Sequence, residues 1–310
     1  MKEITVLAPA TVANVVCGFD CLGFALENPC DEMTLRLIAE KTVRIKHLDD
    51  FGLPTDPEKN IAGVALLALM KKRGGDVGFE IEINKRIKPG SGIGSSSASA
   101  VGAVFGANKL LDDRFSYREL AEFAMEGEQI ASEGRHADNI APCLLGGFTL
   151  VRSVDPLHIV GLKHPPLYAT VIHPQIEIKT SDARKILPTE ISLKSAVQAW
   201  SNVAGLVAGL LQPNYPLIED SLEDFIIEPV RKKLIPHFDD LKGASLEAGA
   251  LGGGISGSGP SVFMLSIDLE TARKVEKAMC EIYAPTGIDF NIYVSGISAK
   301  GVKVKKKRQL

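Results

Sequence analysis

Glycine and serine crowd two separate segments of this 310-residue chain. One is Pro89-Gly-Ser-Gly-Ile-Gly-Ser-Ser-Ser-Ala-Ser99, and the other is Gly252-Gly-Gly-Ile-Ser-Gly-Ser-Gly-Pro260. Glycine lets backbone N–H groups approach a phosphate closely, and a helix that begins directly after such a loop adds further free N–H groups. The first segment lies between a predicted strand and a predicted helix, so it is a candidate phosphate site. The second could form another wall of the same site.

The first loop fits neither of two common nucleotide motifs. A Walker A loop ends in Gly-Lys-Ser/Thr, whereas here Gly94 is followed by Ser95. A dinucleotide fingerprint requires GxGxxG, but this loop is GxGxG, and Asp112-Asp113 follow a predicted helix instead of a second strand. A mere tight connection between strand and helix is the plain alternative, although the Gly and Ser content exceeds what a turn needs.

Composition narrows the class of protein. Hydrophobic residues make up 45% and charged residues 24%, and the formal net charge is −3, which gives no global electrostatic basis for binding nucleic acid or a membrane. The five cysteines form no zinc or disulfide pattern, and no signal peptide or membrane span is evident, so we expect a cytoplasmic protein. The short basic tail from Lys303 to Arg308 is expected to be a solvated, frayed end.

Hydrophobic periodicity predicts an α+β chain that positions these loops. The predicted strands are 3–7, 32–38, 78–84, 148–152, 167–172, 261–266 and 288–295, and the predicted helices are 60–72, 116–131, 192–211, 270–283 and one from the first loop to about Leu111. Ser116 and Glu119 form a capping box at the start of one helix. Pro165-Pro166 lie near the expected boundary between two domains, 1–160 and 161–310.

Three ordered motifs resemble those of the GHMP kinases, a superfamily that includes galactokinase, homoserine kinase and mevalonate kinase. They are Pro9-Ala-Thr-Val-Ala-Asn14 with Gly18-Phe-Asp20, then Gly90-Ser-Gly-Ile-Gly-Ser-Ser-Ser97, then Gly254-Ile-Ser-Gly-Ser-Gly-Pro260. The chain is most similar to the homoserine kinase family, through His136-Ala-Asp-Asn139, Thr180-Ser-Asp-Ala-Arg184 and Glu228-Pro-Val-Arg231. The resemblance implies a ribosomal-protein-S5-like N-terminal domain, a ferredoxin-like C-terminal domain, a homodimer, and ATP-dependent phosphorylation of L-homoserine in threonine biosynthesis.

The resemblance also implies roles for single residues. The residues implied for ATP are Asn60, Pro89, Gly90, Ser91, Gly92, Ile93, Gly94, Ser95, Ser96, Ser97, Ala98, Ser99, Gly257, Ser258 and Gly259; those for Mg²⁺ are Ser96 and Glu128; and those for catalysis are Asn14, Glu128 and Asp138. Arg184 and Arg231 suit the homoserine carboxylate, because a guanidinium can bind two oxygens at once. Asp20 suits the ammonium group. The residues implied for the remaining hydrogen bonds are Asn14, His136, Asn139 and Thr180.

Plainer interpretations stand beside these roles. Without the resemblance, Glu128 reads as an exposed helix carboxylate, the two arginines as surface charges, and Asn60 as an N-cap. Asp138 could orient the substrate hydroxyl or accept its proton, or the phosphate itself could take that proton. A GHMP kinase for mevalonate or shikimate, and a non-catalytic ligand sensor of the same fold, are the alternative functions.

Overall fold

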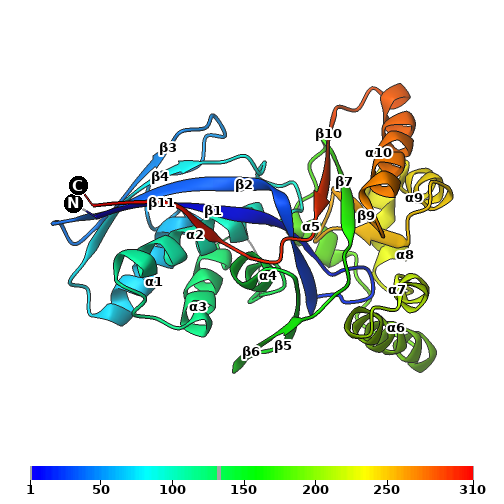
Figure 1. The fold of residues 1–310 in the computed structure, drawn as a ribbon, viewed down its shortest axis with the longest axis horizontal. Coiled ribbons are helices and arrows are strands. Elements are labelled where there is room, and N and C mark those ends of the chain that lie inside the picture. Colours follow the sequence, from blue (N-terminus) through cyan, green and yellow to red (C-terminus); the bar gives the residue numbers. More distant parts are fainter. Residues whose placement is uncertain (1, 131–133, 310) are drawn as a thin grey trace.

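Two β-sheets with helices packed around them make up the protein (Figure 1). The computed structural model describes residues 2–130 and 134–309. The strands are β1 Lys2–Ala13, β2 Leu22–Ile38, β3 Val43–His47, β4 Gly78–Asn84, β5 Phe148–Val154, β6 Leu157–Leu162, β7 Tyr168–Pro174, β8 Gly252–Ile255, β9 Val262–Ser266, β10 Phe290–Gly296 and β11 Lys303–Gln309. The helices are α1 Ile61–Arg73, α2 Ser95–Leu110, α3 Tyr117–Glu128, α4 Ile140–Leu145, α5 Thr180–Lys185, α6 Leu193–Leu211, α7 Tyr215–Ser221, α8 Glu228–Arg231, α9 Phe238–Glu247 and α10 Leu269–Tyr283. The predicted α+β class is confirmed.

The larger sheet runs β11-β1-β2-β4-β3, and β5 pairs with the first part of β2 and with β6. The strict alternation that predicted β4 follows from its position, because Phe79, Ile81 and Ile83 are buried while Glu80 and Glu82 lie on the other face. Helices α1, α2 and α3 lie together below this sheet in Figure 1.

Small residues let α2 approach the sheet closely. A Cβ atom on Gly102 would lie 2.7 Å from the Met33 sulfur, and one on Gly106 would lie 2.5 Å from a Leu35 methyl carbon, which is well inside van der Waals contact. The run of small residues that follows the glycine–serine loop is therefore explained by packing. This packing fixes where the N-terminus of α2 points.

The smaller sheet has the order β10-β7-β9-β8, and all its neighbouring strands pair antiparallel. Helices α9 and α10 pack against it and share a core with Ile172, Val262 and Met264. The buried residues of α10 are Ala272, Val275, Met279 and Tyr283, spaced three or four apart, which is the amphipathic pattern that predicted this helix. The strand β8 was not predicted, since three of its four residues are glycine.

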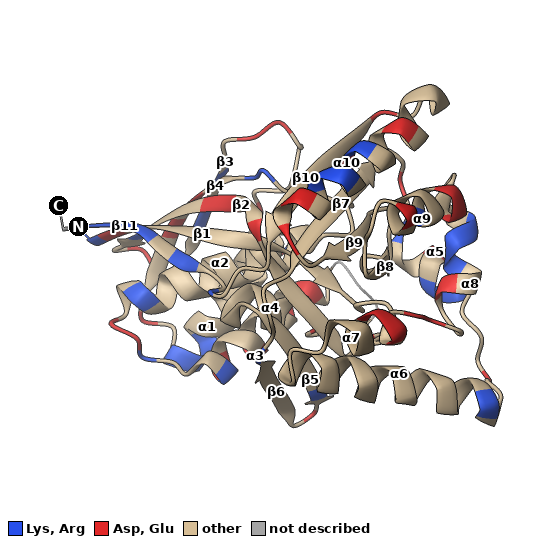
Figure 2. Ribbon diagram, turned by 45° about the vertical axis from the view of Figure 1, so that its right-hand side comes forward, with Lys and Arg blue, Asp and Glu red and all other residues tan. Residues whose placement is uncertain are grey.

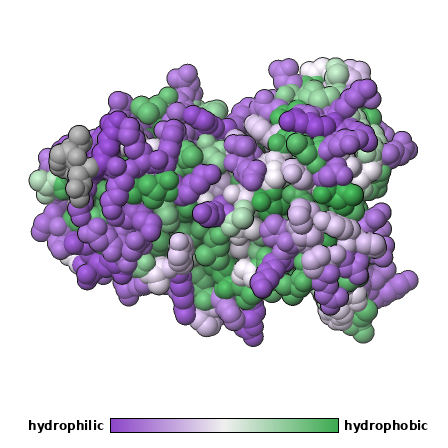
Figure 3. All heavy atoms as spheres, viewed as in Figure 1, coloured by the Kyte–Doolittle hydropathy of each residue, from purple (hydrophilic) through white to green (hydrophobic). Residues whose placement is uncertain are grey.

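The prediction of a frayed basic tail is wrong. Residues of β11 pair antiparallel with β1, from Lys2 opposite Gln309 to Leu7 opposite Lys303. Figure 1 accordingly shows the two termini together, and Figure 3 shows mostly hydrophilic side chains at that end of the molecule on the face in view. The side chains from Lys303 to Arg308 are exposed because β11 is an edge strand. The segment therefore lacks the alternation of apolar and polar residues by which a half-buried strand is predicted.

Among the helices of the described ranges, none combines the length and the hydropathy that a bilayer span requires.

Candidate active site

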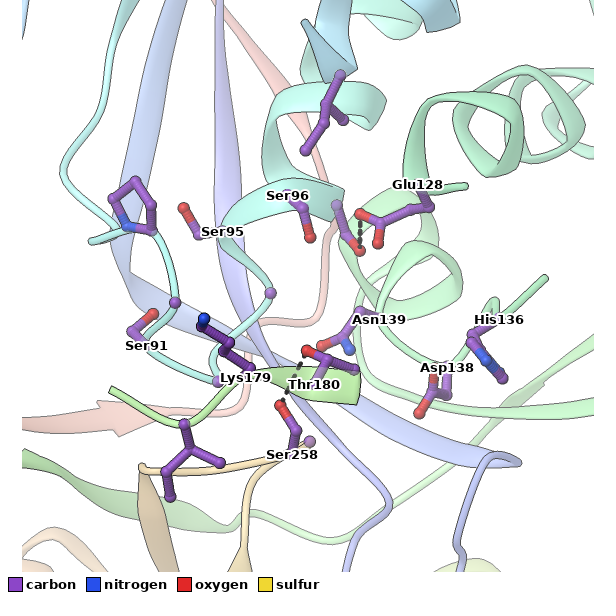
Figure 4. A pocket seen from close by; sticks show the side chains of 18 of the residues that line it. Ser91, Ser95, Ser96, Glu128, His136, Asp138, Asn139, Lys179, Thr180 and Ser258 are labelled. Carbon is purple, nitrogen blue, oxygen red and sulfur yellow. Dashed lines mark hydrogen bonds between the residues drawn. The ribbon is translucent and has the colours of Figure 1, made fainter. Parts of the chain in front are cut away.

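A cavity of about 680 Å³ collects residues from distant parts of the chain. Its lining includes most of the residues singled out from the sequence, namely Asn14, Asp20, Pro89, Gly90, Ser91, Gly92, Gly94, Ser95, Ser96, Ser97, Ser99, Glu128, His136, Asp138, Asn139, Thr180, Arg184, Arg231, Gly257 and Ser258. Figure 4 shows several of them facing a common space. Motifs up to about 240 positions apart in sequence are thus brought into one site.

The glycine–serine loop needs its glycines. Gly90, Gly92 and Gly94 all adopt left-handed backbone, with φ between 71° and 80°, which side chains disfavour. A Cβ on Gly94 would collide with the Thr11 hydroxyl. Gly94 is the N-cap of α2, and no side chain within the described ranges caps this helix. Its first N–H groups are therefore available to an anion at the cavity wall.

The second glycine-rich segment is fastened to the first, as predicted. The Ser256 hydroxyl donates to the Gly92 carbonyl at 2.7 Å, and the Ser261 hydroxyl donates to the Ser91 carbonyl at 2.6 Å. A Cβ on Gly92 would lie 2.6 Å from the Gly259 carbonyl oxygen. The two loops form adjoining walls, and Gly259 supports the wall without lining the cavity.

A buried ion pair holds the start of α2 and was not found from the sequence. Lys85 Nζ donates to Asp31 Oδ2 at 2.5 Å, to the Ser95 carbonyl at 3.0 Å and to Ser99 Oγ at 2.8 Å. The other Asp31 oxygen accepts from the backbone N–H groups of residues 86 and 87. Only the pairing of β2 with β4 reveals this contact, because its partners are 54 positions apart.

Glu128 ends α3 beside the first turn of α2. Ser97 Oγ donates to Glu128 Oε1 at 2.9 Å, as the dashed line in Figure 4 shows. Burial raises the pKa of Glu128, and hydrogen bonds from Ser96 and Ser97 act in the opposite direction. Glu128 is therefore not a merely exposed helix carboxylate. A carboxylate beside serine hydroxyls is a hard-oxygen donor set of the kind that Mg²⁺ accepts together with phosphate oxygens and waters.

No cluster of three or more His, Cys, Asp or Glu side chains suited to a metal occurs within 2–130 and 134–309. The described side chains alone thus do not form a complete metal-binding site. The donor set around Glu128 fits a cation that binds together with a phosphate ligand and is coordinated by both the protein and the phosphate.

At the other end of the cavity, acidic and basic side chains face each other. Arg184 donates from Nη2 to Asp20 Oδ1 at 2.9 Å and from Nη1 to Asp20 Oδ2 at 3.2 Å. His136 Nδ1 lies 3.4 Å from Arg184 Nη2, and burial lowers the pKa of His136, which favours a neutral, accepting ring. Asp20 and Arg184, expected to bind opposite charges of one zwitterion, are hydrogen-bonded to each other here.

Two arginines share one aromatic ring. The guanidinium carbon of Arg184 lies 5.6 Å and that of Arg231 lies 5.0 Å from the centroid of Phe19. Arg231 is buried and donates to the carbonyls of Ala183 and Gly257, both at 3.0 Å. Neither arginine is a plain surface charge. Phe19 also lines the cavity; it lies within the Gly18-Phe-Asp20 motif, but no role was predicted for it because a phenyl ring carries no chemical signal of its own.

Two asparagines fasten the first motif to the others. Asn14 has φ 72°, accepts from the Asp20 N–H at 3.0 Å and donates to the Gly257 carbonyl at 2.8 Å. Asn139 Oδ1 accepts from Thr11 Oγ1 at 2.7 Å. Across the cavity, the Thr180 and Ser258 hydroxyls lie 3.3 Å apart. These bonds hold the motifs in register around the cavity.

Asp138 is buried at the cavity wall. Burial raises the pKa of its carboxyl to about 7, and repulsion from Asp20 adds to that shift. A carboxyl with this pKa can exchange a proton near neutral pH.

Four predicted residues stay outside the lining: Asn60, Ile93, Ala98 and Gly259. Asn60 is the N-cap of α1, accepting from the N–H groups of residues 62 and 63 and donating to the Pro54 carbonyl. The structure does not bring its side chain to the cavity. Conversely, Lys85, Glu177 and Lys179 line the cavity although no motif indicated them.

Comparison with known proteins agrees with the geometry. The family model for the GHMP kinases N terminal domain matches residues 60–147, and that for the GHMP kinases C terminal matches residues 204–285. A homoserine kinase from Chloroherpeton thalassium is 45% identical over 98% of this chain and 100% of its own length, and one from Methanocella arvoryzae is 38% identical over 98% of each.

Solved structures agree as well. The crystal structure of homoserine kinase from Cytophaga hutchinsonii superposes with a TM-score of 0.93 at 52% identity, covering 97% of each chain. Mevalonate kinase from L. major superposes with a TM-score of 0.68 at 14% identity over 93% of this chain and 94% of its own, a likeness of fold alone.

Proposed function

This chain belongs to the homoserine kinase family of the GHMP kinases, and from that premise we propose how its residues carry out the reaction. The enzyme transfers the γ-phosphoryl group of ATP to the side-chain hydroxyl of L-homoserine, which gives O-phospho-L-homoserine in threonine biosynthesis. The observation that carries the assignment of roles is the cavity itself, where a phosphate-type loop faces a pair of arginines and an aspartate.

The ATP phosphates lie against the glycine–serine loop and the N-terminus of α2. Left-handed glycines bring backbone N–H groups to the wall, and the uncapped helix adds its dipole. Gly257 and Ser258 form the opposite wall. Asn60 acts indirectly at most, because its side chain is committed to capping α1.

Homoserine binds where Asp20 faces Arg184. The substrate carboxylate binds the guanidinium groups of Arg184 and Arg231, and the substrate ammonium binds the carboxylate of Asp20. The internal Asp20–Arg184 ion pair is thereby exchanged for ionic contacts of Arg184, Arg231 and Asp20 with the zwitterion. His136 and Thr180 supply further hydrogen bonds from the two sides.

Glu128 and the hydroxyl of Ser96 would hold Mg²⁺, and Ser97 donates to the same Glu128 carboxylate. When bound, this ion neutralises charge on the phosphates. The protein's own contribution is to keep the carboxylate beside the start of α2.

Phosphoryl transfer depends mainly on positioning and electrostatics, so a dedicated base is not required. Asp138 accepts a hydrogen bond from the substrate hydroxyl and orients it toward the γ-phosphate. The hydroxyl proton passes to a phosphoryl oxygen as the new O–P bond forms and the bond to ADP breaks. Asn14 supports the site by fixing Asp20 and Gly257.

We place the domain boundary between β6 and β7, a few residues after the boundary of 160/161 expected from the sequence, which would fall within β6. The large sheet ends with β6 at Leu162, and the small sheet begins with β7 at Tyr168. The final strand β11 returns to the first domain. All five cysteines are free, which accords with a reducing, cytoplasmic location.

Two copies associate through α6. Leu193, Val197 and Trp200 are exposed on one face of this helix, with 73%, 44% and 56% of their surfaces accessible. Lys194 is the single charged residue of the helix, which is tan almost throughout in Figure 2. Exposing this apolar face to water is unfavourable, and the face has almost no charge with which to bind a polar partner. The same face of a second copy would bury it in a symmetric dimer.

Sedimentation velocity tests this association. Trp200→Glu should shift the protein from dimer to monomer, while Leu48→Glu, at an exposed position outside α6, should leave it unchanged. A wild-type protein that sediments as a monomer at micromolar concentration would contradict the proposed dimer.

The function is tested by ADP release in a coupled assay with ATP and Mg²⁺. L-Homoserine should support turnover, whereas mevalonate, shikimate and galactose should not. Turnover with mevalonate alone would point to another GHMP kinase. Binding of homoserine without turnover would point to a ligand sensor.

A further inference from the structure

Four cationic side chains line the cavity, and three of them are already engaged. Lys85 uses its ammonium on Asp31, Ser95 and Ser99. Arg184 is bonded to Asp20, and Arg231 to two backbone carbonyls. The fourth is Lys179, for which the described residues provide no hydrogen-bond acceptor or ion-pair partner.

Lys179 lies in the extended segment between β7 and α5, directly before Thr180. Its backbone is extended, with φ −71° and ψ 133°. In Figure 4 its amine points across the cavity toward the side where Ser91 and Ser95 lie. The ammonium thus faces the glycine–serine loop from the opposite wall.

A triphosphate needs more positive charge than the loop supplies. Backbone N–H groups and serine hydroxyls offer partial charges, and the helix N-terminus amounts to about half a unit charge. Glu177, the acidic neighbour of Lys179 in the same segment, is exposed and forms no ion pair with it within the described residues. Lys179 is itself exposed, so its ammonium is hydrated rather than committed to a protein group and is free to bind phosphate oxygens in the cavity.

We propose that Lys179 binds the terminal phosphates of ATP from the wall opposite the N-terminus of α2. This assignment rests on the placement of ATP given under the proposed function. It adds a nucleotide-binding residue on the same short segment that carries Thr180 and Arg184, so both substrates are contacted from α5 and the residue that precedes it.

The test compares Lys179→Ala with Lys179→Arg and with Lys185→Ala. Lys185 is a matched control, because it is an exposed lysine of α5 that pairs with Asp182 and does not line the cavity. Calorimetric titration gives the Kd for ATP, ADP and AMP, and steady-state kinetics give the two KM values.

For Lys179→Ala we expect ATP to bind roughly tenfold more weakly, since a charged hydrogen bond is lost at a partly solvated site. AMP affinity and the KM for homoserine should stay within about twofold, because neither contacts the ammonium. Lys179→Arg should restore most of the ATP affinity, and Lys185→Ala should match the wild type.

Two results would overturn the assignment of Lys179 while wild-type activity stands. One is an unchanged Kd for ATP in Lys179→Ala, and the other is an equal loss for AMP and ATP. Failure of the wild-type protein to bind ATP or to phosphorylate homoserine would instead overturn the placement of ATP, and Lys179 with it.

Discussion

The carboxyl of Asp138 changes its charge state near neutral pH. Its folded-state pKa is about 7, above the ordinary value of 3.8, because burial and Asp20 disfavour the ionised form. The protonated group therefore stabilises the fold below about pH 4, and that contribution is lost as the pH rises through 7. A carboxylate that accepts the substrate hydroxyl must be ionised, so activity follows the opposite trend.

We predict that kcat/KM for homoserine rises with pH around 7 and that Asp138→Asn flattens this rise. The variant should turn over more slowly without becoming inactive, because the phosphate itself takes the proton. A pH–rate profile of both proteins is the measurement. A loss beyond roughly 10⁴-fold, the upper range for general-base catalysis, would show that Asp138 is a dedicated base.

The guanidinium of Arg184 provides the second test at this scale. Arg184→Ala removes a charged bidentate donor, so the KM for homoserine should rise by about ten- to a hundredfold while the KM for ATP changes little. Arg273→Ala serves as the control, because Arg273 pairs with Glu276 at the exposed surface of α10. An unchanged KM for homoserine would take Arg184 out of the substrate site.

Residues with a motif could be identified from the sequence, and isolated residues could not. Asn14, Asp20 and Arg184 belong to ordered patterns, and the structure brings all three to one cavity. Lys179 also lines it, as does Phe19 of the Gly18-Phe-Asp20 motif, but their roles follow from tertiary packing that no local spacing encodes. The Lys85–Asp31 contact likewise depends on which strands become neighbours.

Among the elements, the loop before α2 contains left-handed glycines whose surroundings differ from one position to the next. Gly90 and Gly94 have nearly the same φ, 74° and 71°. A Cβ on Gly90 would meet nothing within 4 Å, whereas a Cβ on Gly94 would collide with Thr11 and lie 3.1 Å from Asn139 Oδ1. The two positions share the backbone strain and differ in the packing.

We therefore predict that Gly90→Ala costs about 1 kcal/mol of unfolding free energy, the strain of a left-handed alanine. Gly94→Ala should cost at least about 1 kcal/mol more and weaken ATP binding, since the start of α2 must shift away from Thr11. Urea denaturation and ATP titration of both variants provide the comparison. Equal losses at the two positions would mean that the collision is relieved without moving the helix.

Helices and strands with a clear hydrophobic periodicity could be predicted from the sequence. Elements that form because they pair with a neighbouring strand could not. The limits of β4 agree with the prediction at 78–84, and the capping box of Ser116 and Glu119 is present. In contrast, β8 is nearly all glycine and is held in place by pairing with β9. The signal for such a strand lies in its partner, outside the segment itself.

On the scale of the whole molecule, the last strand joins the end of the chain to its beginning. The chain leaves the large sheet after β6, forms the small sheet, and returns as β11 beside β1. Lys305 also pairs with Glu32 at 2.7 Å, and Arg308 lies 3.8 Å from Glu3; the two cations are exposed, whereas Glu3 is buried. Ion pairs with an exposed, mobile partner contribute little, so backbone pairing accounts for most of the strand's effect.

We predict that removing residues 303–310 lowers the melting temperature by a few degrees and promotes association, because it exposes the edge of β1. The KM values should be unchanged, since no residue of β11 lines the cavity. A matched variant replaces Lys305, Lys306, Lys307 and Arg308 by Gln, which keeps the strand and removes four of its five positive charges. If backbone pairing is the cause, this variant should melt within about one degree of the wild type. A truncated protein that melts like the wild type and stays monodisperse would mean that β11 contributes no more than a frayed tail.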